Sequence, residues 1–282
     1  MRLHESGVSS RIAGAALIAA LCAAPSARAW SPAVHELVTS RAVDTLPKPL
    51  KQFYKIHRLE MPTLAPPGME EEEPTPPAGE GPERRFAADA LVPFPFAELP
   101  RSEAEVKERF PDKADTLGRL PWLIQESYAR LVEAFKAKDK VRILTESDTL
   151  ASLVTDLNNP LSLTENFDGQ RTGQHGLWIR FAEKLPEALG KRLEISPDAA
   201  RYLDDPRGYV FSVISRCYVW VDNLLYVDDL ARRGKPGYSE IYFEALRLRA
   251  EAFLKERLSA AAEDAGSYWY TAWTAAGRPD LP

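Results

Sequence analysis

The sequence predicts an all-α fold. Apolar residues recur at helical spacing along most of the chain, and several of these stretches begin at Ser, Asp or Pro and end before Gly or Pro. No segment alternates apolar and polar residues as a half-buried strand would, and no fixed-period repeat is visible. The chain has 282 residues and 45% hydrophobic side chains, which is enough for a large buried core. We therefore expect a single multi-helix bundle over residues 30–282, built round a central long helix.

Residues 1–29 are predicted to be a signal peptide. Two arginines precede an apolar run over residues 12–24, and the Ala-Arg-Ala triplet that ends at residue 29 has the small-x-small form of a signal-peptidase site. The apolar run is too short to span a bilayer. We expect an exported protein, periplasmic or extracellular, whose mature chain starts at Trp30.

The first two helices are predicted over residues 32–46 and 47–61. Ser31 suits an N-cap, and Pro32 suits the first helical position, because the N–H that proline lacks has no partner there. Residues 62–84 follow, with seven Pro and six Glu and almost no apolar side chains. Such a segment cannot repay the entropy of ordering, so we expect a disordered acidic loop.

The rest of the chain supplies the other helices. Asp205 and Pro206 form an N-cap and first-turn pair, and Gly234 marks the end of the long helix that they open. Apolar residues occur nearly all round this helix, so we expect it to be the central one. Helices are predicted over residues 102–110, 112–139 with a break or new start near Pro121, 148–160, 179–190, 205–233 and 238–262.

Charge and cysteine content exclude several classes of protein. Without residues 1–29 the chain keeps 33 basic and 40 acidic side chains, a formal charge of −7, and no basic patch suits duplex nucleic acid. Arg216, Asp222 and Asp228 argue against a transmembrane segment in the long apolar helix. Cys217 would be the only cysteine of the mature chain, which excludes an intramolecular disulfide.

The stretch from Asp148 to Pro160 has two faces. At 100° per residue, Ser152, Asp156 and Asn159 fall within roughly 80° of one another, opposite a face of leucines and valine. The helix must end near Pro160, and a loop rich in Gly, Asn and Asp follows. A polar stripe of this kind is typical of a helix that carries ligands into a pocket.

The residues from Asp156 onward resemble a known family. Asp156, the Pro160-Leu161 pair and the sequence ENFDGQRTGQHG are similar to the bacterial branch of the zinc-dependent phospholipase C and single-strand zinc nuclease superfamily. The resemblance covers nearly the whole mature chain except the acidic loop. It implies an all-α fold and a three-zinc cluster that cleaves phosphate esters.

The resemblance also implies metal ligands, most of which are replaced in this chain. Asp156 stands at the place of the bridging aspartate. Arg85 stands where a histidine would precede an aromatic residue, and no upstream aspartate matches the general base, so no catalytic residue is assigned. In a second register His175, not Trp178, takes the place of the third histidine. The family's other histidine and acid positions hold Ser152, Asn158, Ser162, Trp178 and Ala182.

Trp30 and His35 match the family at the expected spacing. The resemblance implies that the α-amino group and carbonyl oxygen of a processed Trp30 chelate one metal ion, and that His35 completes the site. The alternative is a surface histidine on an amphipathic helix.

Two functions remain open. The first is an exported pseudoenzyme whose cluster is reduced to Trp30, His35 and Asp156, and which acts as a binding or structural protein. The second is a divergent metal-dependent phosphoric ester hydrolase, in which Asp148 and His175 join His35 and Asp156 in a smaller site.

The number of ligands favours the pseudoenzyme, because zinc phosphodiesterase chemistry needs several ligands for each ion of a cluster. We expect at most one or two zinc ions, with no ion as the other outcome. An oxygen-rich site would favour Mg²⁺, Ca²⁺ or Mn²⁺. The ligand class that the resemblance implies is a phosphate ester or phospholipid head group, and the sequence indicates no protein partner.

Overall fold

The computed structural model describes residues 29–64, 81–235 and 237–282, and every regular element within them is helical. The prediction of an all-α fold is therefore confirmed. A π-helical turn, η6 (Arg180–Lys184), joins two of the helices, and short 3-10 turns connect others. The α-helices are α1 (Pro32–Thr45), α2 (Lys48–Ile56), α3 (Glu103–Arg109), α4 (Leu120–Ala137), α5 (Lys140–Leu157), α6 (Leu177–Ile179), α7 (Leu185–Leu189), α8 (Pro206–Tyr218), α9 (Trp220–Arg232) and α10 (Glu240–Ala275).

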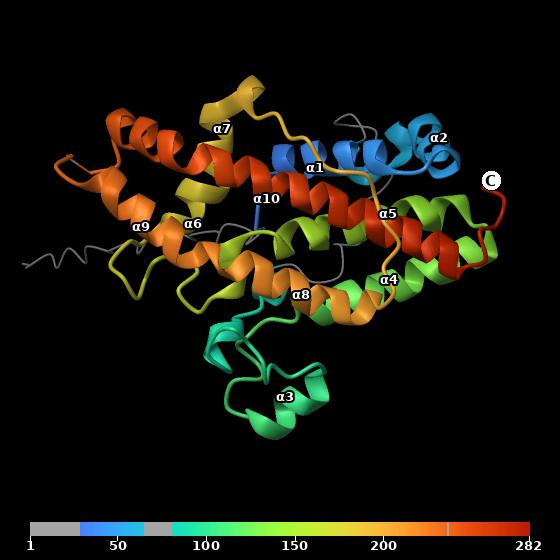
Figure 1. Ribbon diagram of the computed structural model, residues 1–282, viewed down its shortest axis with the longest axis horizontal. Helices are drawn as coiled ribbons and strands as arrows, with labels where there is room; N and C mark the ends of the chain where they lie inside the picture. The colour runs from blue at the N-terminus through green and yellow to red at the C-terminus, as the bar shows by residue number, and fades with distance from the viewer. Residues whose placement is uncertain (1–28, 65–80, 236) are drawn as a thin grey trace, which may run out of the picture.

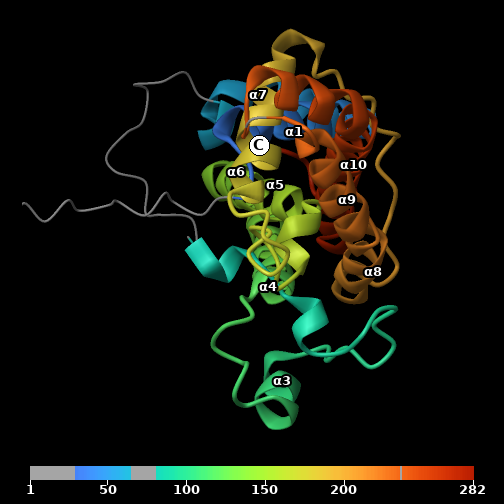
Figure 2. The same ribbon diagram turned by 90° about the vertical axis from the view of Figure 1, so that its left-hand side faces the viewer.

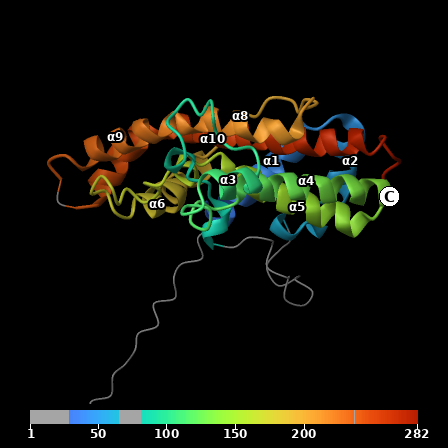
Figure 3. The same ribbon diagram turned by 90° about the horizontal axis from the view of Figure 1, so that it is seen from below.

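Helix α10 organises the bundle. It has 36 residues, runs along the long axis of the molecule and packs against α1, α4, α5 and α9 (Figure 1). In the view from below, α8, α9 and α10 lie on one side of the bundle and α4 and α5 on the other (Figure 3). The segment around α3 projects away from the helices (Figure 2). Helix α5, which carries the polar stripe, therefore has α10 on one side and α1 and α4 on others.

The long helix predicted over residues 205–233 is interrupted. Helix α8 ends at Tyr218 and α9 begins at Trp220, with Val219 in a turn between them. Val219 is exposed, and Tyr218 packs edge-on against Phe96 at 4.7 Å between ring centroids. The prediction of a central helix here is wrong, because α10 holds that position and continues to Ala275 instead of ending near residue 262.

The segment Pro206–Arg232 is the one stretch of the described residues with the length and apolar content to cross a membrane, and 44% of its most apolar window is buried inside the protein. Asp228 in this segment is fully buried and pairs with Arg180. These observations are compatible with the expectation that the chain has no transmembrane segment.

Both ends of the predicted acidic loop are ordered. Residues Pro62–Leu64 and Gly81–Arg84 form 3-10 turns, and Leu64 and Arg84 are buried. The prediction of disorder over residues 62–84 is therefore wrong at its two ends. Residues 65–80 lie outside the described residues, as do residues 1–28 of the predicted signal peptide.

Gly266 allows α10 to lie close to α1. A Cβ added there would lie 2.0 Å from Thr45 Oγ1 and 3.2 Å from the carbonyl oxygen of Ala42. We expect Gly266→Ala to lower the free energy of unfolding by about 1–3 kcal/mol, because overpacking forces the helices apart. Urea titration measures the change. Adding Thr45→Ala removes the nearest atom and should recover part of the loss, and a double variant no more stable than Gly266→Ala would contradict this explanation.

Candidate functional site

The polar stripe of α5 is buried and meets residues from distant parts of the chain. Asp156 and Asn159 are fully buried, and Ser152 is partly buried. His35 of α1 and Arg84 of the 3-10 turn η3 (Gly81–Arg84) approach the stripe from outside α5. Ser152 and Asp156 therefore share one face, as predicted, whereas Asn159 lies beyond the end of α5. Arg84 was not expected to join them.

Arg84 binds two residues of the stripe at once. Its Nε donates to Oδ2 of Asp156 at 2.5 Å, and its Nη2 donates to Oγ of Ser152 at 2.6 Å. The side chain of Arg84 is 2% exposed and that of Asp156 is 0% exposed, so this ion pair is shielded from water. Burial alone would raise the pKa of Asp156, but the Arg84 guanidinium and the neighbouring His35 outweigh it and hold the pKa below its usual range.

The second oxygen of Asp156 faces His35. His35 Nε2 lies 3.2 Å from Asp156 Oδ1, within ion-pair distance, and neither atom has any other polar partner among the described residues. Two ligands of one tetrahedral zinc ion, each about 2.0–2.1 Å from the metal, lie about 3.3 Å apart. The spacing of this buried pair therefore fits two ligands of a single metal ion.

Trp30 lies beside the same end of α5. Its indole Nε1 donates to the carbonyl oxygen of Thr155 at 3.0 Å, and its ring packs against Phe181 at 5.3 Å between centroids. Asn159 Nδ2 donates at 2.6 Å to the carbonyl oxygen of Ala29, which belongs to the peptide group that joins Ala29 to Trp30. The indole of Trp30 thus contacts the residue before Asp156, while His35 faces Asp156 directly.

Asp148 and His175 lie elsewhere. Asp148 is two turns, about 12 Å, before Asp156 on α5, and it accepts hydrogen bonds from the backbone nitrogen of Thr63 at 3.2 Å and from its hydroxyl at 2.8 Å. His175 is exposed in the loop before α6, and its carbonyl oxygen accepts from Arg180 Nη1 at 2.7 Å. In the described part of the chain, no group of three or more His, Cys, Asp and Glu side chains could hold a metal ion.

The positions at which the family resemblance implies further ligands take part in other contacts. Asn158 donates to the carbonyl oxygen of Val154 and to Asp264. The carbonyl oxygen of Ser162 accepts from the Phe86 nitrogen at 2.7 Å, while its buried hydroxyl has no partner among the described residues. The other two, Trp178 and Ala182, are buried in the apolar cluster that contains Trp30.

No protein-family model matches the chain, and no curated protein and no solved structure matches it.

Proposed function

We propose that this chain is an exported, catalytically impaired relative of the zinc-dependent phospholipase C and nuclease superfamily that acts as a binding or structural protein. In this proposal Arg84 supplies a permanent positive charge where relatives hold metal, and at most one metal ion binds beside it. The observation that carries the proposal is that the two oxygens of Asp156 have different partners: Oδ2 is bound by Arg84, while Oδ1 faces only His35.

The role of Arg84 follows from its charge and its fixed position. A bridging carboxylate must offer one oxygen to each of two metal ions, and here one oxygen is already bound by a guanidinium. Arginine stays protonated at any physiological pH and cannot serve as a ligand while charged. It can neutralise Asp156, but it cannot activate a water molecule as a metal ion does. This arrangement supports a site that keeps the electrostatic balance of a metal cluster without its chemistry.

The open side of Asp156 suits one ion. His35 Nε2 and Asp156 Oδ1 would provide two ligands, and the processed N-terminus of Trp30 would provide an amine and a carbonyl oxygen. A bound ion would supply a Lewis acid there. A single ion leaves no second cation to stabilise the leaving oxygen. Loss of a multi-metal site raises the free energy of the transition state by several kcal/mol and lowers the rate by many powers of ten.

The reduced hydrolase remains the second candidate, because the buried pair of His35 and Asp156 is where a single ion would bind. That candidate was expected to draw on Asp148 and His175 as well. The bonds from Thr63 to Asp148 and the exposed position of His175 support the pseudoenzyme instead. A small phosphate ester or phospholipid head group remains the proposed ligand class.

Metal analysis of the mature protein tests the proposal. We expect no more than one zinc ion per chain when residue 30 is the first residue, and less zinc when one extra residue precedes Trp30, because the free amine is then displaced. Phosphodiester hydrolysis in excess zinc is measured beside it. Three bound ions together with hydrolysis would overturn the proposal, and equal zinc in both forms would rule out the N-terminal chelate.

A further inference from the structure

A cavity lies on the outer side of the segment that carries Arg84. Arg84 and Arg85 are consecutive, but Arg84 points into the core and Arg85 points outwards towards the loop after α5. The cavity has a volume of about 240 Å³, enough for several water molecules or a small anion. Its walls include Arg85, Lys113, Thr164, Glu165, Phe167 and Arg171.

Positive charge dominates this cavity. Arg171 pairs with Glu165 at 2.8 Å, but within the described residues neither Arg85 nor Lys113 has an acidic partner, and Lys113 donates only to the carbonyl oxygen of Ala90. The walls therefore carry three positive charges and one negative charge, on a chain whose formal charge is −5.

Asp89 lies behind this wall, but its oxygens are occupied. Oδ1 accepts from the Glu165 nitrogen, and Oδ2 accepts from the hydroxyls of Thr164 and Tyr218. Asp89 therefore orders the loop, and no ion pair joins it to Arg85 or Lys113 among the described residues.

Arg85 is held in a fixed position. Its guanidinium carbon lies 3.6 Å from the centre of the Phe167 ring, and its buried Nε has no hydrogen-bond partner among the described residues. Its backbone oxygen accepts from the Leu120 nitrogen and lies so close to Gly118 that a Cβ there would be 2.1 Å away. A half-buried cation with an unused donor is costly unless an anion completes it.

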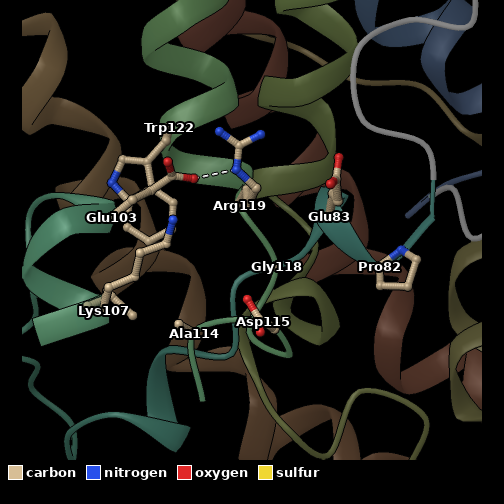
Figure 4. A pocket seen from close by; sticks show the side chains of 10 residues that line it. Pro82, Glu83, Glu103, Lys107, Ala114, Asp115, Gly118, Arg119 and Trp122 are labelled. Carbon is tan, nitrogen blue, oxygen red and sulfur yellow. Dashed lines mark hydrogen bonds and ion pairs between the residues drawn. The ribbon is translucent and has the colours of Figure 1, made fainter. Parts of the chain in front are cut away.

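The neighbouring cavity provides a contrast (Figure 4). It has a volume of about 300 Å³ and lies on the other side of Gly118. Its positive residues Lys107 and Arg119 face three carboxylates, and Arg119 pairs directly with Glu103. The positive charge in that cavity is fully matched, so the excess at Arg85 is a local feature and not a property of the whole surface.

We propose that the Arg85 cavity binds a small oxyanion, a phosphate or carboxylate group, through the Arg85 guanidinium, with Lys113 as the second positive group. A guanidinium is suited to this because its planar fork can donate two parallel hydrogen bonds to one oxyanion. The site is separate from the Asp156 cluster, so it needs no metal and holds whether or not the proposed function is correct.

Calorimetric titration of the full mature chain with sodium phosphate and with sodium acetate tests this inference, in EDTA and at ionic strength matched with sodium chloride. We expect phosphate or acetate to bind without metal, and Arg85→Gln to weaken that binding roughly tenfold or more, the usual loss for a charge-assisted hydrogen bond. Arg119→Gln removes the same charge from the matched cavity and should change the affinity less than about twofold.

Lys113→Gln is a second variant, since Arg85→Gln also removes the contact with Phe167 and could loosen the loop. It should weaken binding as well while its circular dichroism and melting temperature stay like those of the unmodified protein. The inference would be overturned if neither anion bound, or if an anion bound only when zinc is present. It would also be overturned if Arg85→Gln and Lys113→Gln bound the anion as tightly as the unmodified protein. Anion binding only in the presence of zinc would contradict this inference but would agree with the metal site of the proposed function.

Discussion

Replacing Arg84 with alanine is expected to destabilise the protein strongly. The substitution leaves the Asp156 carboxylate buried without its closest positive partner, which costs about 3–5 kcal/mol of unfolding free energy. Urea titration at neutral pH measures the loss. Arg109→Ala is the control, because Arg109 forms a half-exposed pair with Glu105 and should contribute about 0–1 kcal/mol.

The pH dependence of the unfolding free energy, compared between the unmodified protein and Arg84→Ala, gives a second readout. The pKa of Asp156 is lower in the folded protein than in the unfolded chain, so the ion pair adds stability above about pH 4, and this contribution is lost as the pH falls through the folded value. The difference in stability between the unmodified protein and Arg84→Ala should therefore narrow in acid. A difference that stays constant from pH 7 to pH 3 would show that Arg84 acts through packing alone.

Zinc tests whether the guanidinium occupies a metal position. In the Arg84→Ala, Ser152→His double variant, Asp156, His35 and the new histidine could bind one ion, and zinc at 100 times its dissociation constant would add about 2.7 kcal/mol. Ser152→His alone should gain much less, because Arg84 still binds Asp156 Oδ2. Equal zinc stabilisation in the single and double variants would contradict the idea that the arginine replaces a cation.

The second large effect is expected at Asp228. This residue is fully buried, and its carboxylate accepts from Arg180, Tyr242 and Gln174. Arg180 also donates to the carbonyl oxygens of Gln174 and His175, so it ties the loop before α6 to α9 and α10. Asp228→Asn leaves this buried guanidinium without its carboxylate, and we expect a loss of about 3–5 kcal/mol.

The adjacent residue provides a matched control for that substitution. Asp229 pairs with Arg233 on the surface, where both side chains are largely exposed. Asp229→Asn makes the same chemical change one residue away and should alter the unfolding free energy by about 0.5 kcal/mol or less. Similar losses from Asp228→Asn and Asp229→Asn would contradict a structural role for the Arg180 network.

Much of the fold could be predicted from local signals. The Asp205 side chain caps α8 by accepting from the Gly208 nitrogen, as the Asp205-Pro206 pair predicts. The periodicity of α5 predicts which of its faces is polar, because each residue of a helix is turned by a fixed 100°. The break at Val219 could not be predicted, since no Gly or Pro marks it and the contacts of Tyr218 with Phe96 and Asp89 come from far along the chain.

The main residue of the candidate site was missed for a similar reason. Arg84 and Arg85 lie in a short 3-10 turn and the irregular chain after it, where no periodicity says which side chain faces inwards. The composition around them favoured a solvated loop. Only the three-dimensional contact with α5 shows that Arg84 balances a buried carboxylate, while Arg85 faces the cavity outside.

The bond between Asn159 and the Ala29 carbonyl oxygen also constrains when the chain could be processed. A protease must draw several residues of extended backbone into its own cleft, yet Ala29 is fully buried and Trp30 is 1% exposed. If a peptidase cleaves the peptide bond between Ala29 and Trp30, it must act while this segment is still detached from α5. Maturation would then precede folding of the N-terminal part, and a chain that folded first would keep its leader.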